Sequence, residues 1–195
     1  MSGTCQRIPF AVEFEVKEVE QKDSTFSSEN EDSEHMKDST TVLTRLKVNV
    51  TDPLAEQELS NFVRTVEEGK ALQPFFIGLM QYAEWHSNRQ RTFDHFNMKY
   101  PEVVHSIGVS TASQVIQLHN RSKPGLVFTV LWRLDISESG RVMPDLQIHA
   151  TAPLKRTGQR DKYALLKSVP QQFQKVLPIL GIEQTIEVVI GMLCR

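Results

Sequence analysis

The chain has 195 residues, of which 39% are hydrophobic, and its 22 basic residues nearly cancel its 24 acidic ones. A chain of this length can bury an adequate core as one domain or as two small ones. The charge balance gives no reason to expect nucleic acid, an anionic membrane or a polyanionic substrate as a partner. The two cysteines, Cys5 and Cys194, lack the spacing of a disulfide framework or a zinc knuckle, which fits a reducing compartment. No apolar run is long enough to span a membrane and no signal pattern opens the sequence, so we expect a soluble, intracellular protein.

The N-terminal part predicts two strands. Phe10, Val12, Phe14 and Val16 alternate with small or charged residues, which places their side chains on one face of a strand. A second alternating stretch covers residues 42–50 and can pair with the first as a hairpin. Its expected inward-facing residues are Val42, Leu46, Val48 and Val50.

The segment between these strands, residues 23–40, is rich in acidic residues and serine. Such a composition cannot bury enough apolar surface to offset the entropy that is lost on ordering. We therefore expect a flexible acidic loop. The alternative is a segment controlled by phosphorylation of its serines, because added phosphate would deepen the negative charge.

Two helices are predicted next. The first covers residues 53–69, where Asp52 is a typical cap and apolar residues recur at helical spacing. The second covers residues 74–100 and ends there because Pro101 disfavours helical geometry in the residue before it.

Beyond this helix the apolar period returns to two. It predicts four short strands, at residues 103–109, 114–119, 126–136 and 142–150. Turn residues between them favour an antiparallel meander. The third strand, which contains Trp132, is apolar on both faces, so we expect it in the middle of a sheet that packs on helices. The fourth contains Pro144, which cannot donate to a ladder, so it should lie at an edge or carry a bulge.

The C-terminal part returns to helical spacing, in pieces separated by Pro170, Pro178 and Gly181. The order of elements therefore predicts an α+β fold of two units with antiparallel sheets flanked by helices. Residues 71–195 form a helix, four strands and further helices. Residues 1–70 form two strands and a helix, which is a similar but incomplete unit.

The sequence holds no catalytic or metal-binding constellation that we can identify. His86 and His95 share the long helix but project to different sides, so they cannot form the i, i+4 pair of a metal-binding helix. Three further histidines lie on predicted strands and could converge: His105, His119 and His149. No nearby cysteine or pair of acidic residues completes a ligand set. No nucleophile elbow or phosphate-binding glycine loop occurs. We expect a protein that is not an enzyme and that uses no cofactor or metal.

Two basic clusters leave a second function open. They are Arg89, Arg91 and Lys99 on the long helix, and Lys155, Arg156, Arg160 and Lys162 further on. Contacts between these residues and DNA phosphates would make the chain a DNA- or chromatin-contacting adaptor. Neighbouring acidic residues and the lack of interleaved aromatics favour ordinary solvated faces instead. We expect no direct nucleic-acid binding by this chain alone.

Three groups of residues resemble the centromere protein P family. The first is Glu84-Trp85, Arg89, Arg91-Thr92-Phe93, His95 and Lys99-Tyr100-Pro101. The second is Pro124-Gly125, Trp132-Arg133, Gly140, Val142 and Pro144, and the third is Leu180-Gly181-Ile182-Glu183. The resemblance extends over residues 10–194.

The resemblance implies tandem RWD units, each with a helix, a four-stranded antiparallel sheet and further helices. It implies a nuclear scaffold subunit of the inner kinetochore, the constitutive centromere-associated network, that supports kinetochore assembly and chromosome segregation. The implied partners are centromere protein O as a direct heterodimer, centromere proteins Q, U and R in one complex, and other inner-kinetochore subunits. The family's coiled coil and the first helix and strand of its leading unit are missing from the sequence, so we expect a fragment or a short isoform.

An enzymatic alternative follows from the fold, because RWD domains resemble ubiquitin-conjugating enzymes in outline. Those enzymes need a reactive cysteine after the sheet and a nearby asparagine, and residues 151–162 contain neither. The resemblance therefore favours a scaffold.

The incomplete first unit predicts where a partner binds. A two-stranded hairpin is marginal by itself. Phe10, Val12 and Phe14 form its apolar face, and Leu43 is expected on the otherwise polar side of the second strand. Left uncovered, these residues and the open sheet edge would make a sticky surface. We expect Phe10, Val12, Phe14 and Leu43 to contact a partner chain.

Overall fold

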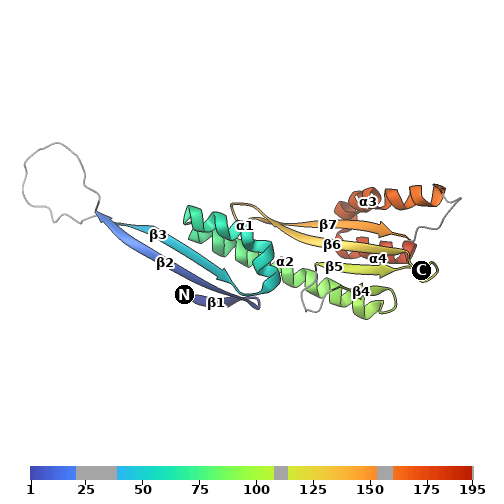
Figure 1. Cartoon of the computed structure of the whole chain (residues 1–195), viewed down its shortest axis with the longest axis horizontal. Helices are drawn as coiled ribbons and strands as arrows, with labels where there is room; N and C mark the ends of the chain where they lie inside the picture. The colour runs from blue at the N-terminus through green and yellow to red at the C-terminus, as the bar shows by residue number, and fades with distance from the viewer. Residues whose placement is uncertain (21–38, 108–113, 153–159, 195) are drawn as a thin grey trace, which may run out of the picture.

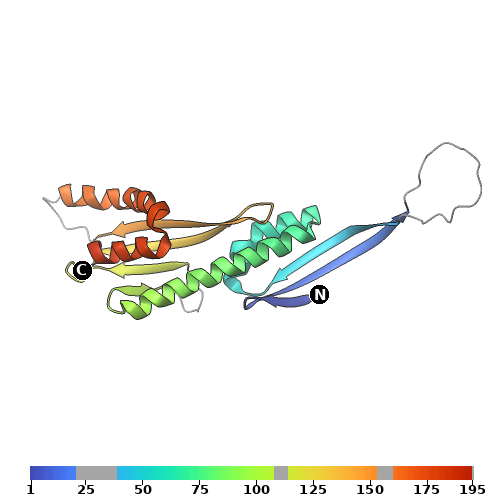
Figure 2. The same cartoon turned by 180° about the vertical axis from the view of Figure 1, so that it is seen from behind.

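A computed structural model shows an elongated α+β molecule, with two antiparallel sheets and four helices in the residues that it describes (Figure 1). It describes residues 1–20, 39–107, 114–152 and 160–194, without the side chains of residues 20, 39 and 160–165. The three-stranded sheet lies at one end, the four-stranded sheet lies at the other, and one long helix runs between them (Figures 1 and 2). The predicted α+β class is confirmed.

The first sheet has the order β1-β2-β3 and is antiparallel throughout. Its strands are β1 (Ser2–Cys5), β2 (Ile8–Glu20) and β3 (Ser39–Val50). The predicted hairpin is therefore present and longer than expected. Ser39 and Thr40, which we assigned to the flexible loop, lie in β3 instead, and the remaining loop residues 23–38 lie outside the described part of the chain.

A register shift in the hairpin corrects one prediction. Phe14 lies opposite Leu46, but after an irregularity at Glu15 and Val16 the partner of Val16 is Leu43. Residues opposite one another share a face, so Leu43 lies on the apolar face with Val16. The expectation that Leu43 lies on the polar side is therefore wrong. Leu43 is partly buried and packs against the core.

Both predicted helices of the middle region are present, as α1 (Pro53–Gly69) and α2 (Leu72–Lys99). The side chain of Asp52 caps α1 by accepting a hydrogen bond of 2.8 Å from the backbone of Ala55. At its other end, Lys70 adopts the left-handed conformation (φ 52°) that reverses the chain into α2.

The second sheet has the order β4-β5-β6-β7, and all neighbours are antiparallel. Its strands are β4 (Val104–Ser106), β5 (Val115–His119), β6 (Val127–Ile136) and β7 (Val142–Thr151). The predicted meander, the interior position of the strand with Trp132 and the edge position of the strand with Pro144 are all confirmed.

Two helices, α3 (Arg160–Leu180) and α4 (Ile182–Leu193), complete the chain. The breaks predicted at Pro170 and Pro178 are wrong, because both residues lie inside α3; Gly181, with φ 77°, separates the two helices. Views from both sides show α2 and α4 on the same face of the second sheet (Figures 1 and 2). The side chain of Gln174 in α3 donates to the carbonyl of Leu146 at 2.6 Å and so ties α3 to β7.

Candidate partner-binding surface

The apolar face of the hairpin passes from buried to exposed along β2. Phe10 is half-buried and its ring lies 6.0 Å from the rings of both Phe75 and Phe76 at the start of α2. Val12 is completely buried. Phe14 and Val16, one and two pleats further on, are 45% and 53% exposed. The helices therefore cover the base of the hairpin and leave its outer half uncovered.

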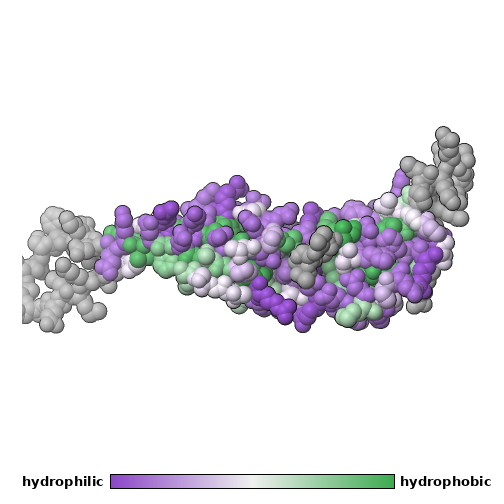
Figure 3. All heavy atoms as spheres, turned by 60° about the horizontal axis from the view of Figure 1, so that its bottom comes forward, coloured by the Kyte–Doolittle hydropathy of each residue, from purple (hydrophilic) through white to green (hydrophobic). Residues whose placement is uncertain are grey.

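The four predicted partner-binding residues differ in their exposure. Phe10 and Val12 pack within this chain, Phe14 is exposed, and Leu43 is partly buried. Their contact with a partner stays a prediction. One further exposed apolar residue, Val16, extends this surface. Val42, which we expected to face inward, is opposite Lys17 and therefore lies on the polar face, as does Val19. In the space-filling view, hydrophobic side chains interrupt the hydrophilic surface over the hairpin (Figure 3). We call Phe14, Val16 and Leu43 the hairpin patch.

The opposite face of the hairpin is mostly polar, with Val19 and Val42 at its outer end. Glu15 and Arg45 lie opposite each other and form an ion pair of 3.3 Å, with about two thirds of each side chain exposed at 63% and 67%. Such exposed pairs contribute little stability. This face is suited to solvent, so the hairpin patch is the apolar side of an amphipathic ribbon.

A buried ion pair holds α1, α2 and the second sheet together. The guanidinium of Arg89 in α2 donates to both carboxylate oxygens of Glu58 in α1 at 2.9 Å, and also to the carbonyl of Trp132 in β6 at 2.9 Å. The two charged side chains are 1% and 5% exposed. Tyr82 donates to the same carboxylate at 2.5 Å, and burial and the Glu58 charge raise the pKa of its hydroxyl. We call Glu58, Tyr82 and Arg89 the buried polar cluster.

This arrangement changes the interpretation of the basic residues. Arg89 is buried and paired, so it cannot contact a phosphate backbone from its place in the fold. Lys99 pairs with Glu187 of α4 at 3.1 Å. Of the second predicted cluster, Lys155 and Arg156 and the side chains of Arg160 and Lys162 lie outside the described residues.

The histidines converge in one pair. The rings of His105 in β4 and His119 in β5 lie 4.6 Å apart, edge to face, and burial followed by the nearby His105 lowers the pKa of His119. His149 has no ring contact with this pair, and in the described part of the chain no three His, Cys, Asp or Glu side chains are placed to hold a metal ion. Among the described helices, none is both long and apolar enough to cross a bilayer.

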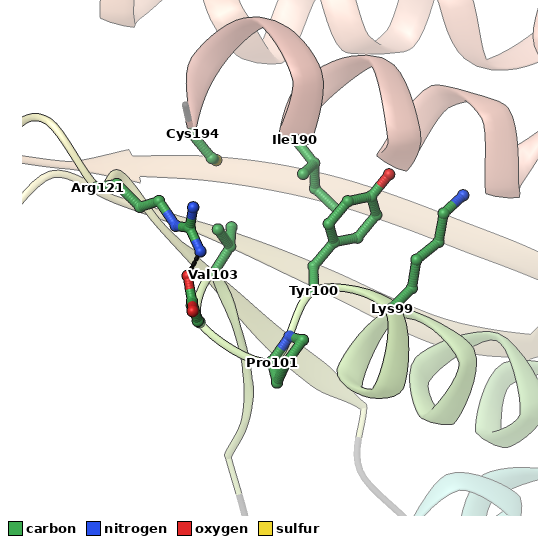
Figure 4. Close-up of a pocket in the computed structure, with 8 residues that line it drawn as sticks. Lys99, Tyr100, Pro101, Val103, Arg121, Ile190 and Cys194 are labelled. Carbon is green, nitrogen blue, oxygen red and sulfur yellow. Dashed lines mark ion pairs between the residues drawn. The ribbon is translucent and has the colours of Figure 1, made fainter.

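A hollow of about 390 Å³ lies between the end of α2 and the end of α4 (Figure 4). Its lining residues are Lys99, Tyr100, Pro101, Glu102, Val103, Arg121, Ile190 and Cys194. Arg121 and Glu102 pair at its rim. Cys194 is buried, and burial raises the pKa of its thiol to about 11, which favours the protonated form. Burial therefore works against activation of this thiol as a nucleophile.

Comparison with known proteins places the chain in a family. A family model described as "CENP-A-nucleosome distal (CAD) centromere subunit, CENP-P" matches residues 1–190. The chain belongs to the centromere protein P family. It is 33% identical to centromere protein P of Homo sapiens over all of its length and 62% of the human protein. Centromere protein P of Mus musculus is 31% identical over 98% of this chain and 61% of the mouse protein. That of Gallus gallus is 32% identical over 96% of this chain and 59% of the chicken protein.

The chain spans about three fifths of the length of these curated centromere protein P relatives. The family match begins at residue 1, so it includes the hairpin patch as well as the buried polar cluster. The matched part also contains the residues on which we based the resemblance to this family, on α2, in the second sheet and at the start of α4.

Proposed function

We propose that this chain is a non-enzymatic scaffold subunit of the inner kinetochore, acting in the nucleus at the centromere, and that it heterodimerises with centromere protein O. Membership of a family of centromere subunits supports the setting. The observation that carries the heterodimer is the hairpin patch: the face that is fully buried at Val12 is about half exposed at Phe14 and Val16. A partner that continues the layer formed by α1 and α2 would bury it.

The fold suits a scaffold because it separates two ends and fixes the distance between them. The hairpin patch is at one end, the second sheet is at the other, and α2 runs between them (Figure 1). We propose that both ends are RWD-like units, and that the second contributes to contacts with centromere proteins Q, U and R and with other inner-kinetochore subunits. Exposed apolar side chains remain available on it: Met143, Val188 and Met192.

The alternative of a DNA-contacting adaptor is less favoured by the structure. Of the three cations in the cluster on α2, Arg89 is buried against Glu58 and Lys99 is paired with Glu187. That leaves Arg91, which is exposed and donates to the side-chain amide oxygen of Asn88, as a single cation for a phosphate.

The heterodimer is tested by co-expressing the chain with centromere protein O and measuring a 1:1 complex by size-exclusion chromatography with light scattering. Phe14→Asp should abolish or strongly weaken the complex, because it places a charge in the middle of the hairpin patch. Met143→Asp is the matched control, since Met143 is similarly exposed at 52% but lies on β7. Equal losses for both variants, or none for either, would contradict the proposed surface.

A further inference from the structure

The outer edge of β3 has backbone hydrogen-bonding groups without a strand partner in the described part of the chain. Val12 exchanges backbone hydrogen bonds with Met1, at 2.7 and 2.8 Å, so its polar groups point away from β3. Opposite residues in an antiparallel ladder alternate between pairs that bond each other and pairs that point outward. Val12 and Val48 therefore form an outward-pointing pair.

The alternation extends along the hairpin to the patch. Two residues beyond Val12, the pair of Phe14 and Leu46 also points outward, and beyond the register shift so do Val16 with Leu43 and Glu18 with Thr41. On β3, the N–H and C=O groups of Leu46, Leu43 and Thr41 thus form a row along the free edge. A strand that paired there would lie beside the hairpin patch.

The same edge is closed at its base. The N–H of Val48 donates to the carboxylate of Glu67 in α1 at 2.7 Å. A side chain in that position occupies the donor that a neighbouring strand would need. The open part of the edge is therefore limited to residues 39–46, which is the length of a short strand.

Charge distinguishes the two edges of the hairpin. The polar face of β3 carries Arg45 and Lys47 near the open edge, whereas that of β2 carries Glu13 and Glu15. A second copy that paired through β3 by a two-fold axis would bring like charges together, which is unfavourable. Pairing β3 of one copy with β2 of another would match charges but would not close into a dimer. The edge is better suited to a different chain.

We infer that the outer edge of β3 receives an extended strand of the partner chain, in which acidic residues on the polar face alternate with apolar residues that join the hairpin patch. Backbone hydrogen bonds at Thr41, Leu43 and Leu46 provide the affinity, and the acidic residues complement Arg45 and Lys47. This inference rests on the proposed heterodimer and specifies how its interface is built.

The test compares Thr41→Pro with Thr41→Val in the complex with centromere protein O. Proline removes the outward N–H, and a strand tolerates it where the N–H is not used within its own sheet; valine keeps the N–H and the branched shape. We expect Thr41→Pro to weaken the complex about tenfold, the effect of losing roughly one net hydrogen bond, and Thr41→Val to bind like the unchanged chain. Circular dichroism and the melting temperature check that both variants fold.

A second measurement reports the edge directly. Amide hydrogen exchange, measured by NMR on the free chain and on the complex, should show new protection at Thr41, Leu43 and Leu46. Val48 is the internal control, because its N–H is already bonded to Glu67 and should change little. Arg45→Glu combined with Lys47→Glu should weaken the complex further, and more so at low salt.

The outcomes separate the two proposals. If the unchanged chain does not bind centromere protein O, the proposed heterodimer fails and this inference fails with it. If the unchanged chain binds, Phe14→Asp does not, and Thr41→Pro binds normally without new protection on β3, the heterodimer stands and strand addition is wrong. New protection from amide exchange that is confined to the edge of β2 would likewise show that strand addition at β3 is wrong.

Discussion

The pairing of Arg89 with Glu58 is the most demanding interaction at the scale of single residues. Both charges are almost completely withdrawn from water, so each depends on the other for compensation. We predict that Arg89→Met lowers the free energy of unfolding by about 3–5 kcal/mol, because the carboxylate of Glu58 is left buried and unpaired. Urea unfolding followed by fluorescence measures the change.

Two comparisons control for lost side-chain packing. Replacing both charges, as Glu58→Leu with Arg89→Met, should cost much less than either single change, since no buried charge remains. Arg133→Gln should cost less than about 1 kcal/mol, because the ion pair with Asp145 at 3.1 Å is substantially exposed. A double variant as unstable as the sum of the single ones would show that the two charges do not depend on each other.

His86 provides a pH-dependent test beside the same cluster. It stacks on Tyr82 with ring centroids 5.8 Å apart, and burial followed by the nearby Arg89 cation lowers its pKa below the usual 6.5. The unfolded chain then binds more protons, so stability should decrease as the pH falls below about 6.5 and level off below the pKa of the folded state. We expect His86→Gln to flatten this part of the stability profile between pH 7 and 5. An unchanged slope of stability against pH in this variant would show that other groups cause the pH dependence.

The sequence showed the residue types of this cluster but not its contacts. Arg89 was predicted to be a solvated cation because a basic residue near others on a helix usually lies on the surface. Its partner Glu58 lies 31 residues away on another helix, and no local period links the two. By contrast, Val12 and Trp132 were predicted to lie on apolar faces and are buried, because alternation within one strand is a local signal.

At the scale of elements, the turn between β6 and β7 shows how closely the second sheet approaches α2. Gly140 has φ 82°, and a Cβ there would lie 2.7 Å from the backbone oxygen of Pro74 and 3.0 Å from the nitrogen of Gly78. We predict that Gly140→Ala destabilises the chain by roughly 1–3 kcal/mol through backbone strain and overlap. Thermal unfolding measures this, with Gly191→Ala as the control, because a Cβ at Gly191 meets nothing within 4 Å. Equal melting temperatures for the two variants would contradict the close approach.

Elements were predicted well where one local signal dominated. The meander of β4 to β7 and the two helices α1 and α2 followed from period and turn residues. Strand β1 was missed, because Ser2–Cys5 has no apolar alternation and forms a strand by pairing with β2. Helix α3 continues through Pro170 although an interior proline disfavours a helix. Its contacts, with Phe173 buried and Gln174 bonded to β7, outweigh that cost.

At the scale of the whole molecule, the division into residues 1–70 and 71–195 stays a prediction, and the packing connects the two parts. The buried residues form one continuous core, which runs from Val12 in the first sheet through Phe62 and Phe75 to Trp132 in the second. The buried polar cluster adds a connection between α1 and β6. An isolated second part would expose the face of α2 that now packs on α1 and the first sheet.

We therefore predict that the chain unfolds in a single cooperative transition. Both tryptophans, Trp85 and Trp132, lie next to each other with ring centroids 6.5 Å apart, so fluorescence reports on the second sheet and α2 alone. Far-ultraviolet circular dichroism reports on all elements, and the amide signals of β2 in NMR report on the hairpin base. In urea these three probes should give the same midpoint, because loss of one part exposes the core of the other. Glu58→Gln should separate the midpoints by weakening the link between α1 and the second sheet. Coincident midpoints in that variant would show that the coupling between the two parts does not depend on the buried polar cluster. Separate midpoints in the unchanged chain would show that the two parts unfold independently.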